Sequence, residues 1–344
     1  MTIAGTSLPL DDFRRLVRDL PGADAEAVRQ CQARDKVLTK PPGALGRLED
    51  IAAWVSAWQH RYPPRIDMPV VAVFAGNHGV VGQGVAAYPQ AVTAQMVANF
   101  QAGGAAVNQV CKVHGLGLKV FELALDRPTE DITEDAALSE VDCAGTMAYG
   151  MQAIAGGCDL LCIGEMGIGN TTIAAAICHG LYGGAAADWA GPGTGLDAAG
   201  VRRKAEVVAR AVERHRPHLG DPLEVLRRLG GRELAAMAGA ILAARIEHVP
   251  VLIDGYVASA AAAILHAMRP DALDHCLAGH QSAEPAHRRL LDRLGMRPLL
   301  DLGMRLGEGS GAALAAGIVK SAVALHTGMA SFESAGVSDR AAPG

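Results

Sequence analysis

The sequence predicts an α/β protein that combines a doubly wound, mainly parallel sheet with a small helical domain. Four short, mainly apolar runs alternate with longer segments of helical spacing, at residues 70–75, 118–123, 160–163 and 249–253. Strands that are apolar at every position are typical of a parallel sheet covered by helices on both faces. Glycine or Asp-Gly directly follows three of these runs, and ligands of such sheets lie beyond the carboxyl ends of the strands. We therefore expect a Rossmann-like fold with its site at those strand ends.

Residues 1–65 predict the small helical domain. Apolar residues recur there at helical spacing in three segments, 10–20, 24–36 and 46–58. Pro63-Pro64 closes this part of the chain, since consecutive prolines interrupt regular structure. We place the domain boundary there and assign residues 66–325 to an α/β catalytic domain. We expect the C-terminal segment 326–344 to join the helical domain.

Helical spacing also predicts the segments that cover the sheet. These helices are expected at residues 93–113, 142–155, 171–182, 197–216, 232–247, 258–268, 284–294 and 309–327. Two further runs, 275–278 and 298–302, are weaker strand candidates. The alternation of strand and helix is what a doubly wound fold requires.

Composition excludes several classes of protein. The 344 residues carry a formal net charge of −5, which argues against a nucleic-acid partner because such surfaces are strongly basic. No apolar run reaches the roughly 18 uncharged residues of a membrane span, and the first residues show no signal segment with a basic start and an apolar centre. Seven scattered cysteines fit no disulfide framework. We therefore expect a cytoplasmic protein without a membrane span.

A glycine-rich segment follows the third apolar run and opens a helix. It reads Gly164-Glu165-Met166-Gly167-Ile168-Gly169-Asn170-Thr171-Thr172. Glycines let the backbone approach a phosphate, and the free N–H groups at a helix start point at it. The spacing nearly matches a triphosphate-binding loop, but Asn170 stands where that loop has Lys, so a monophosphate or diphosphate fits better. The alternative is a plain glycine-rich turn in which Asn170 or Thr171 caps the helix.

A second unusual loop places Glu308 between glycines. It reads Gly303-Met304-Arg305-Leu306-Gly307-Glu308-Gly309-Ser310-Gly311. A carboxylate in a cramped, weakly solvated loop has a raised pKa and can act as a general base. Taken alone, the pattern favours the commoner interpretation, which is a Glu in the first turn of a helix, where it complements the helix dipole.

Two other loops carry weaker signals. His78 follows the first apolar run and fits a hydrogen-bonded structural histidine better than a catalytic one. Tyr88, further along that loop, offers a flat ring to a flat ligand. The glycine-rich segment 191–195 precedes three cations that a phosphate could use, Arg202, Arg203 and Lys204. The commoner interpretation of these cations is a solvated helix face.

The histidines near the C-terminal end of the α/β part do not predict a metal site. His275, Cys276, His280 and His287 match no zinc spacing, and the chain has no CxxC motif. Ser282, in the same region, fits a helix N-cap or a phosphate contact.

Together these loops resemble the nicotinate-nucleotide–dimethylbenzimidazole phosphoribosyltransferases, a family of cobalamin biosynthesis. The matching segments follow the family's order between residues 36 and 325. They are Lys40-Pro41-Pro42-Gly43-Ala44-Leu45-Gly46-Arg47-Leu48-Glu49, Asn77-His78-Gly79-Val80, Gly164-Glu165-Met166-Gly167, Asn170-Thr171-Thr172, Asp254-Gly255-Tyr256, Ser282-Ala283-Glu284 and Met304-Arg305-Leu306-Gly307-Glu308-Gly309-Ser310-Gly311-Ala312-Ala313-Leu314.

The resemblance implies a reaction, its substrates and an assembly. Nicotinate mononucleotide and 5,6-dimethylbenzimidazole would give α-ribazole 5′-phosphate and nicotinate. No cofactor and no metal are implied. The family is dimeric, so we expect a homodimer in which residues 40–49 of one subunit help to close the partner's site.

The resemblance also assigns roles to residues of this chain. Glu308 matches the family's catalytic glutamate, and Glu165 matches a second functional glutamate in the same cavity. The expected phosphate and ribose contacts are Gly167, Gly169, Asn170, Thr171, Gly193, Lys204, Asp254 and Ser282. The expected base-binding residues are Tyr88, Met96, Met166, Leu306 and Gly307.

Two other functions stay open at this point. One is the same reaction with a different lower-ligand base, either a purine or a phenolic compound. The other is a non-catalytic nucleotide-binding protein on a Rossmann-like sheet, which the presence of both glutamates makes the weaker hypothesis.

Overall fold

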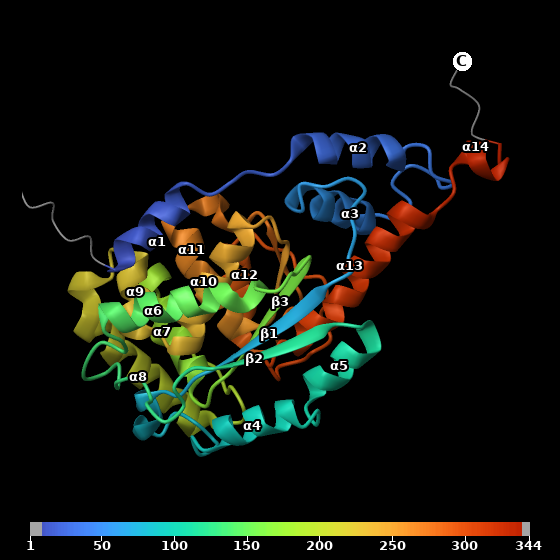
Figure 1. The fold of residues 1–344 in the computed structure, drawn as a ribbon. Helices are drawn as coiled ribbons and strands as arrows, with labels where there is room; N and C mark the ends of the chain where they lie inside the picture. The colour runs from blue at the N-terminus through green and yellow to red at the C-terminus, as the bar shows by residue number, and fades with distance from the viewer. Residues whose placement is uncertain (1–8, 339–344) are drawn as a thin grey trace, which may run out of the picture.

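The computed structural model describes residues 9–338, and within that range five parallel strands form the central sheet (Figure 1). The strands are β1 (Pro69–Ala75), β2 (Gly117–Glu122), β3 (Leu160–Met166), β4 (Val251–Ile253) and β5 (Cys276–Ala278). Their order across the sheet is β2-β1-β3-β4-β5. The chain therefore returns from β2 at one edge across β1 to β3, and such a reversal opens a crevice at the carboxyl ends of these strands. The predicted α/β fold with a parallel sheet is confirmed.

Both faces of the sheet are covered, because successive residues of each strand point to opposite sides. Ala72 and Phe74 of β1 pack into one buried apolar cluster, whereas Val71 and Val73 pack into the other. The first cluster is completed mainly by α6 (Glu140–Gly150), α7 (Asn170–Tyr182), α10 (Arg232–Ile246) and α11 (Tyr256–Met268). The second is completed by α3 (Arg47–Trp58), α5 (Ala106–His114) and α13 (Ser310–Gly328).

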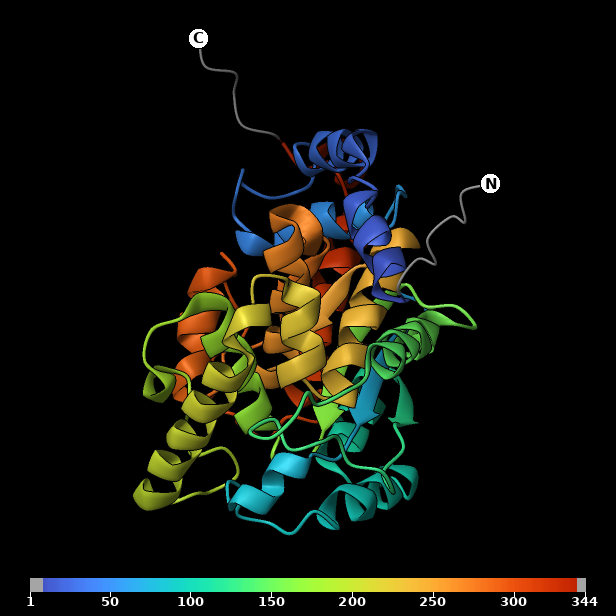
Figure 2. The same cartoon turned by 90° about the vertical axis from the view of Figure 1, so that its left-hand side faces the viewer.

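Four more helices flank these layers. They are α4 (Val92–Gln101), α8 (Ala198–His215), α9 (Pro222–Leu229) and α12 (Pro285–Arg293). Helix α8 packs on α7 and projects from the body of the molecule (Figure 2). By contrast, every residue of α10 from Glu233 to Arg245 is buried. A helix that is apolar or small on every side is typical of a buried position.

Strand β3 is longer than the sequence predicts, and this corrects the interpretation of the glycine-rich segment. Gly164, Glu165 and Met166 belong to the strand, and Glu165 stands in register with Phe74 of β1. The loop therefore begins only at Gly167. Pairing with β1 explains the difference, since a neighbouring strand can hold a residue such as Gly164 that weakens a strand in isolation.

The first helices contact the α/β body in two places. Helix α1 (Pro9–Arg18) buries Leu10 and Phe13 in the same cluster as α6 and α11. Helix α2 (Ala25–Asp35) packs against α3, and both lie beside α13. Beyond α13, the backbone at Leu38 pairs with Ser331, just before the short helix α14 (Phe332–Ala335). The two-domain division stays a prediction, and residues 1–8 and 339–344 of its two ranges lie outside the described part of the chain.

Two other predicted elements need correction, and one helix was missed. The helix expected at 93–113 is two helices, because Gly103 adopts a left-handed φ of 78° and ends α4 before α5 begins. The run 298–302 forms no strand and contributes a single bridge between Leu300 and His280. Helix α9 was not predicted, although Asp221 caps its start through a hydrogen bond with the N–H of Leu223.

Two statements hold for the described range. No helix between residues 9 and 338 combines the length and apolar character needed to cross a membrane. The seven cysteines are all free thiols, and six of them are buried.

Candidate active site

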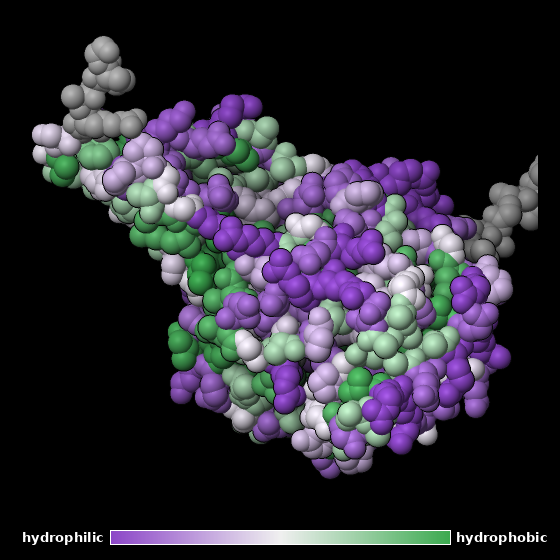
Figure 3. Space-filling model, turned by 180° about the vertical axis from the view of Figure 1, so that it is seen from behind, coloured by the Kyte–Doolittle hydropathy of each residue, from purple (hydrophilic) through white to green (hydrophobic). Residues whose placement is uncertain are grey.

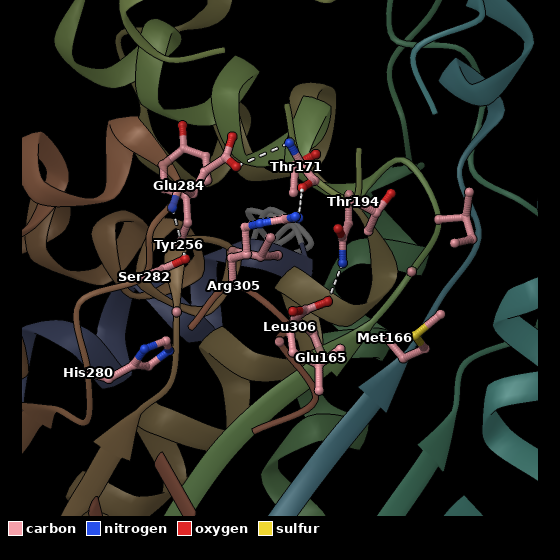
Figure 4. A pocket seen from close by; sticks show the side chains of 17 residues that line it. Glu165, Met166, Thr171, Thr194, Tyr256, His280, Ser282, Glu284, Arg305 and Leu306 are labelled. Carbon is pink, nitrogen blue, oxygen red and sulfur yellow. Dashed lines mark hydrogen bonds between the residues drawn. The ribbon is translucent and has the colours of Figure 1, made fainter. Parts of the chain in front are cut away.

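A pocket opens at the carboxyl ends of β3, β4 and β5. Figure 4 shows side chains from the ends of these strands and from the loop before α13 converging on it. The lining residues are Glu165, Met166, Gly167, Ile168, Asn170, Thr171, Gly193, Thr194, Gly255, Tyr256, Val257, His280, Ser282, Glu284, Arg305, Leu306 and Gly307.

The Gly307-Glu308-Gly309 loop crosses the end of β3 in an unusual backbone conformation. All three residues are left-handed, with φ values of 82°, 66° and 76°. For Glu308 this conformation is strained, and such strain is concentrated at functional sites. The N–H of Glu308 donates a 3.1 Å hydrogen bond to the carbonyl oxygen of Glu165. A Cβ at Gly164 would lie 2.1 Å from the nitrogen of Gly309, so only glycine lets the loop sit this close to the strand.

Two carboxyl groups lie at this crossing, of which Glu308 is buried and Glu165 is half-buried. Burial raises the pKa of Glu308 to about 7, and the neighbouring charge of Asp254 adds to the effect. Burial raises the pKa of Glu165 to about 8, mainly with Asp254 and Glu233, whereas a hydrogen bond from Asn170 opposes the shift. Oε2 of Glu308 has no hydrogen-bond partner among the described residues. Carboxyl groups with pKa values near neutrality are suited to proton transfer.

Asp254, at the end of β4, fixes the start of α13. Its carboxylate accepts hydrogen bonds from the N–H groups of Gly309, at 3.2 Å, and Ala312, at 2.9 Å. Nε2 of His280 lies 3.6 Å from the same carboxylate. Asp254 therefore holds the loop that carries Glu308 instead of lining the pocket.

The other end of the pocket is suited to an anion. Thr171 lies in the first turn of α7, where free N–H groups point outward. Nζ of Lys204 donates hydrogen bonds to Oγ1 of Thr171 and to the carbonyl oxygen of Gly191, both at 2.9 Å. Burial lowers the pKa of Lys204 to about 8, and the charge of Glu284 opposes this shift. A bound phosphate would supply the negative charge that the buried ammonium group favours.

The predicted site residues divide into two sets. Nine of them line the pocket: Glu165, Met166, Gly167, Asn170, Thr171, Gly193, Ser282, Leu306 and Gly307. The other six do not, although Glu308, Gly169, Lys204 and Asp254 each adjoin a lining residue in sequence or through a hydrogen bond. Tyr88 and Met96 are not among the lining residues. Tyr88 is 52% exposed, and Met96 is partly buried on α4.

The sequence reasoning missed several lining residues. Arg305 donates a 3.0 Å hydrogen bond to the carbonyl oxygen of Gly193, and Figure 4 shows it extending across the pocket. Glu284 accepts a hydrogen bond from the N–H of Gly193 at 3.1 Å. Tyr256 and Glu284 stand in the segments that carry the family resemblance, so position in those segments was an available signal. His280 was considered only as a metal ligand.

Two predictions concern histidines. His78 is fully buried, and its Nε2 lies 2.7 Å from Oε1 of Glu233. It does not line the pocket, which fits a structural role better than a catalytic one. Among residues 9–338 no group of three or more His, Cys, Asp or Glu side chains is placed to hold a metal ion.

These features define a class of protein. A parallel sheet with a strand-order reversal, a helix start suited to an anion and two carboxyl groups with raised pKa values fit an α/β enzyme that acts on a small molecule. Comparison with known proteins agrees with that class. Residues 20–337 match the model of a family described as Phosphoribosyltransferase, and the chain belongs to this family.

Relatives and solved structures cover nearly the whole chain. A nicotinate-nucleotide–dimethylbenzimidazole phosphoribosyltransferase of Rhizobium etli (strain CIAT 652) is 68% identical over 99% of this chain and 100% of the relative. A phosphoribosyltransferase of the same name from Sinorhizobium fredii (strain NBRC 101917 / NGR234) is 68% identical over 98% of this chain and 100% of the relative. The crystal structure of the phosphoribosyltransferase of that name from Thermus thermophilus is 40% identical, covers 92% of this chain and 100% of its own, and has a TM-score of 0.84.

Proposed function

We propose that this chain transfers the 5-phosphoribosyl group of nicotinate mononucleotide to 5,6-dimethylbenzimidazole, giving α-ribazole 5′-phosphate and nicotinate in cobalamin assembly. The observation that carries the proposal is the pair of carboxyl groups of Glu308 and Glu165, whose residues are joined by a backbone hydrogen bond beside a pocket that is suited to an anion. Relatives that are 67–68% identical over nearly their full length bear the name of this activity.

The chemistry needs a nucleophile more than an acid. The nicotinate ring is a pyridinium, so the bond from C1′ to its nitrogen breaks without protonation of the leaving group. One ring nitrogen of the benzimidazole forms the new bond to C1′, and the N–H on its other nitrogen becomes acidic. In the ionised form, Glu308 accepts that proton. General-base help of this kind contributes about 10²–10⁴-fold.

Glu165 and the anion-binding end have supporting roles. Glu165 lines the pocket and would bind the hydroxyls of the ribose. In its ionised form, which prevails above its pKa of about 8, it would also offset the positive charge that develops on the ribose as the pyridinium leaves. Lys204, Thr171 and the glycine loops would hold the 5′-phosphate and thereby fix C1′. Bringing the two reactants together in this way contributes up to about 7–11 kcal/mol in model systems.

The base-binding end is proposed to include Tyr88, Met96, Met166, Leu306 and Gly307. Attack from the side opposite the departing ring converts the β linkage to an α linkage. The alternative substrate is a purine or phenolic base in place of dimethylbenzimidazole. Competition between dimethylbenzimidazole, adenine and p-cresol distinguishes these acceptors, and a preference for cresol would overturn our choice.

A homodimer in the cytoplasm is the proposed state of the protein. Apolar side chains gather along the flank below the projecting end formed by α2, α3 and α14 (Figure 3). Contiguous exposed apolar surface is typical of protein interfaces. Seven free cysteines fit a reducing compartment.

The direct test is incubation of the purified protein with nicotinate mononucleotide and dimethylbenzimidazole, followed by chromatography and mass spectrometry. We expect α-ribazole 5′-phosphate and nicotinate in equal amounts. Absence of both products, with a folded protein, would contradict the proposed reaction.

A further inference from the structure

A buried histidine–glutamate pair lies beside Gly167, where the glycine-rich turn begins, and the proposed mechanism does not use it. His78 follows β1, and Glu233 lies in the first turn of α10. Nε2 of His78 is 2.7 Å from Oε1 of Glu233, and neither side chain has exposed surface. No other described residue forms a hydrogen bond with the ring nitrogens of His78 or the carboxylate oxygens of Glu233. Each side chain therefore depends on the other to offset the cost of burying its charge.

Three glycines leave room for this pair. A Cβ at Gly76 would lie 2.5 Å from Oε2 of Glu233, and one at Gly231 would lie 2.4 Å from Cε1 of His78. A Cβ at Gly167 would lie 3.1 Å from both side chains. The backbone at Gly167, where the glycine-rich turn begins, therefore packs against the side chains of His78 and Glu233.

The pair lies beside the hydrogen bond that joins β1 to β3, at the point where the strand order reverses. The N–H of Gly76 donates a 3.0 Å hydrogen bond to the carbonyl oxygen of Met166. The side-chain amide of Gln90 donates a 3.0 Å hydrogen bond to the carbonyl oxygen of His78. Gln90 belongs to the loop that carries Tyr88, a proposed base-binding residue. The backbone of His78 therefore contacts this loop, and its side chain contacts the turn at Gly167.

Charge links the pair to Glu165. Burial is the largest cause of the raised pKa of Glu165, and the charges of Asp254, Glu233 and Glu308 add to it. The hydrogen bond from Asn170 opposes them. A change in the net charge of the His78–Glu233 pair should therefore move the titration of Glu165, whereas a change in packing alone has no fixed direction.

We propose that His78 and Glu233 form an ionised positioning pair that holds the turn at Gly167 against the end of β1 and sets the electrostatic field at Glu165. The pair acts through the turn and through Glu165, and it does not touch the substrate. This role rests on the function proposed above for Glu165. The rival interpretation is a packing contact that stabilises the fold without tuning the site.

The experiment titrates Glu165 in the unliganded protein. Protein labelled with ¹³C at the Glu carboxyl carbon is followed by NMR from pH 5 to pH 10, and the Glu165→Gln variant identifies the Glu165 signal. In Glu233→Gln the midpoint of that titration falls, because a negative charge is removed. In His78→Gln the midpoint rises, because Glu233 loses its positive partner.

A buried histidine elsewhere supplies the control. His275 lies at the amino end of β5, and its Nε2 is 3.0 Å from the carbonyl oxygen of Ile241. His275→Gln should lower the unfolding midpoint but leave the Glu165 titration unchanged. We expect kcat to fall about 10- to 100-fold in Glu233→Gln and His78→Gln, since small misplacements of a site have effects of this size.

Each result decides between the two interpretations. Opposite shifts in the two variants support the ionised pair. Shifts of the same sign, or none, overturn it, even where stability and kcat both fall. If Glu233→Gln does not fold, His78→Gln is compared with His78→Asn, since loss of a positive charge raises the midpoint in both variants, whereas a change in packing has no fixed direction. The NMR result does not depend on turnover, so failure of the proposed reaction would be recognised separately by the absence of α-ribazole 5′-phosphate with the wild-type protein.

Discussion

The backbone N–H of Glu308 hydrogen-bonds to the carbonyl oxygen of Glu165 at 3.1 Å. This single contact joins the end of β3 to the loop before α13, two segments that are far apart in the sequence. It places both carboxyl groups in one weakly solvated region, where burial raises the pKa values to about 7 for Glu308 and about 8 for Glu165. The predictions below start from that arrangement.

The first prediction concerns the general base. Glu308→Gln keeps the size of the side chain but cannot accept the proton, so turnover should fall about 10²–10⁴-fold. Binding of nicotinate mononucleotide, measured by isothermal titration calorimetry, should change little, because the anion-binding end is untouched. Near-normal turnover would contradict the assignment. In the wild type, kcat should rise with pH through about 7 as Glu308 loses its proton.

The second prediction concerns stability at different pH values. The pKa of Glu308 is raised in the folded protein to about 7 from an ordinary 4.5, so the unfolded chain loses this proton more readily. The contribution of Glu308 to stability is therefore complete below about pH 4.5 and is lost as the pH rises to about 7. Glu308→Gln should melt at a higher temperature than the wild type at pH 8, by about 2 °C or more.

Two comparisons check this sign. The difference in melting temperature between Glu308→Gln and the wild type should shrink towards zero at pH 4. Glu206→Gln, at an exposed position on α8, removes a carboxyl without a burial effect and should show no such pH dependence. A Glu308→Gln variant that is less stable than the wild type at pH 8 would mean that the carboxylate is stabilised in the folded site.

The third prediction concerns phosphate binding. Lys204→Met removes the buried ammonium group that hydrogen-bonds to Thr171, and KM for nicotinate mononucleotide should rise about tenfold or more, since charged hydrogen bonds contribute about 1.5–3 kcal/mol. Arg202→Met, at an exposed position on the same helix, is the matched control and should leave KM within about twofold. Equal effects in the two variants would point to general charge attraction.

The same lysine predicts a pH effect in the wild type. Because burial lowers its pKa to about 8, Lys204 loses its charge as the pH rises through that value. KM for nicotinate mononucleotide, measured between pH 7 and pH 9.5, should therefore increase. In Lys204→Met this increase should be absent.

The fold could be predicted because hydrophobic periodicity is local. Uninterrupted apolar runs, such as residues 70–75 and 160–163, predict buried strands from the sequence alone, and the structure confirms strands there. The sequence was insufficient where pairing between neighbouring strands determines whether a residue belongs to a strand. Glu165 was expected in a loop, but pairing with Phe74 keeps it in β3. The predicted strand at 298–302 contacts the end of β5 through a hydrogen bond from Leu299 to Ala278, but it makes only one bridge.

The site could be predicted in part for a similar reason. Glycine-rich loops mark places where the backbone makes a close approach, so the sequence indicated Gly167 and Gly307. It did not indicate Arg305 or His280 as lining residues, because their positions depend on which strand ends lie side by side. The pairing of His78 with Glu233 joins a residue just after β1 to one on α10, and no local pattern connects them.

The last prediction separates backbone strain from contact with the site. Gly307 and Gly303 lie in the same loop with left-handed φ values of 82° and 68°, so alanine at either position costs about 1–2 kcal/mol in strain. A Cβ at Gly307 would also lie 2.5 Å from Oε1 of Glu165, whereas a Cβ at Gly303 would meet nothing within 4 Å. Gly307→Ala should therefore lower kcat about 10- to 100-fold by displacing Glu165, and Gly303→Ala should keep kcat within about twofold. Steady-state kinetics and denaturant unfolding of both variants check this, since similar losses of stability with unequal losses of kcat are expected. Equal losses of kcat would show that strain in the loop, and not the position of Glu165, limits turnover.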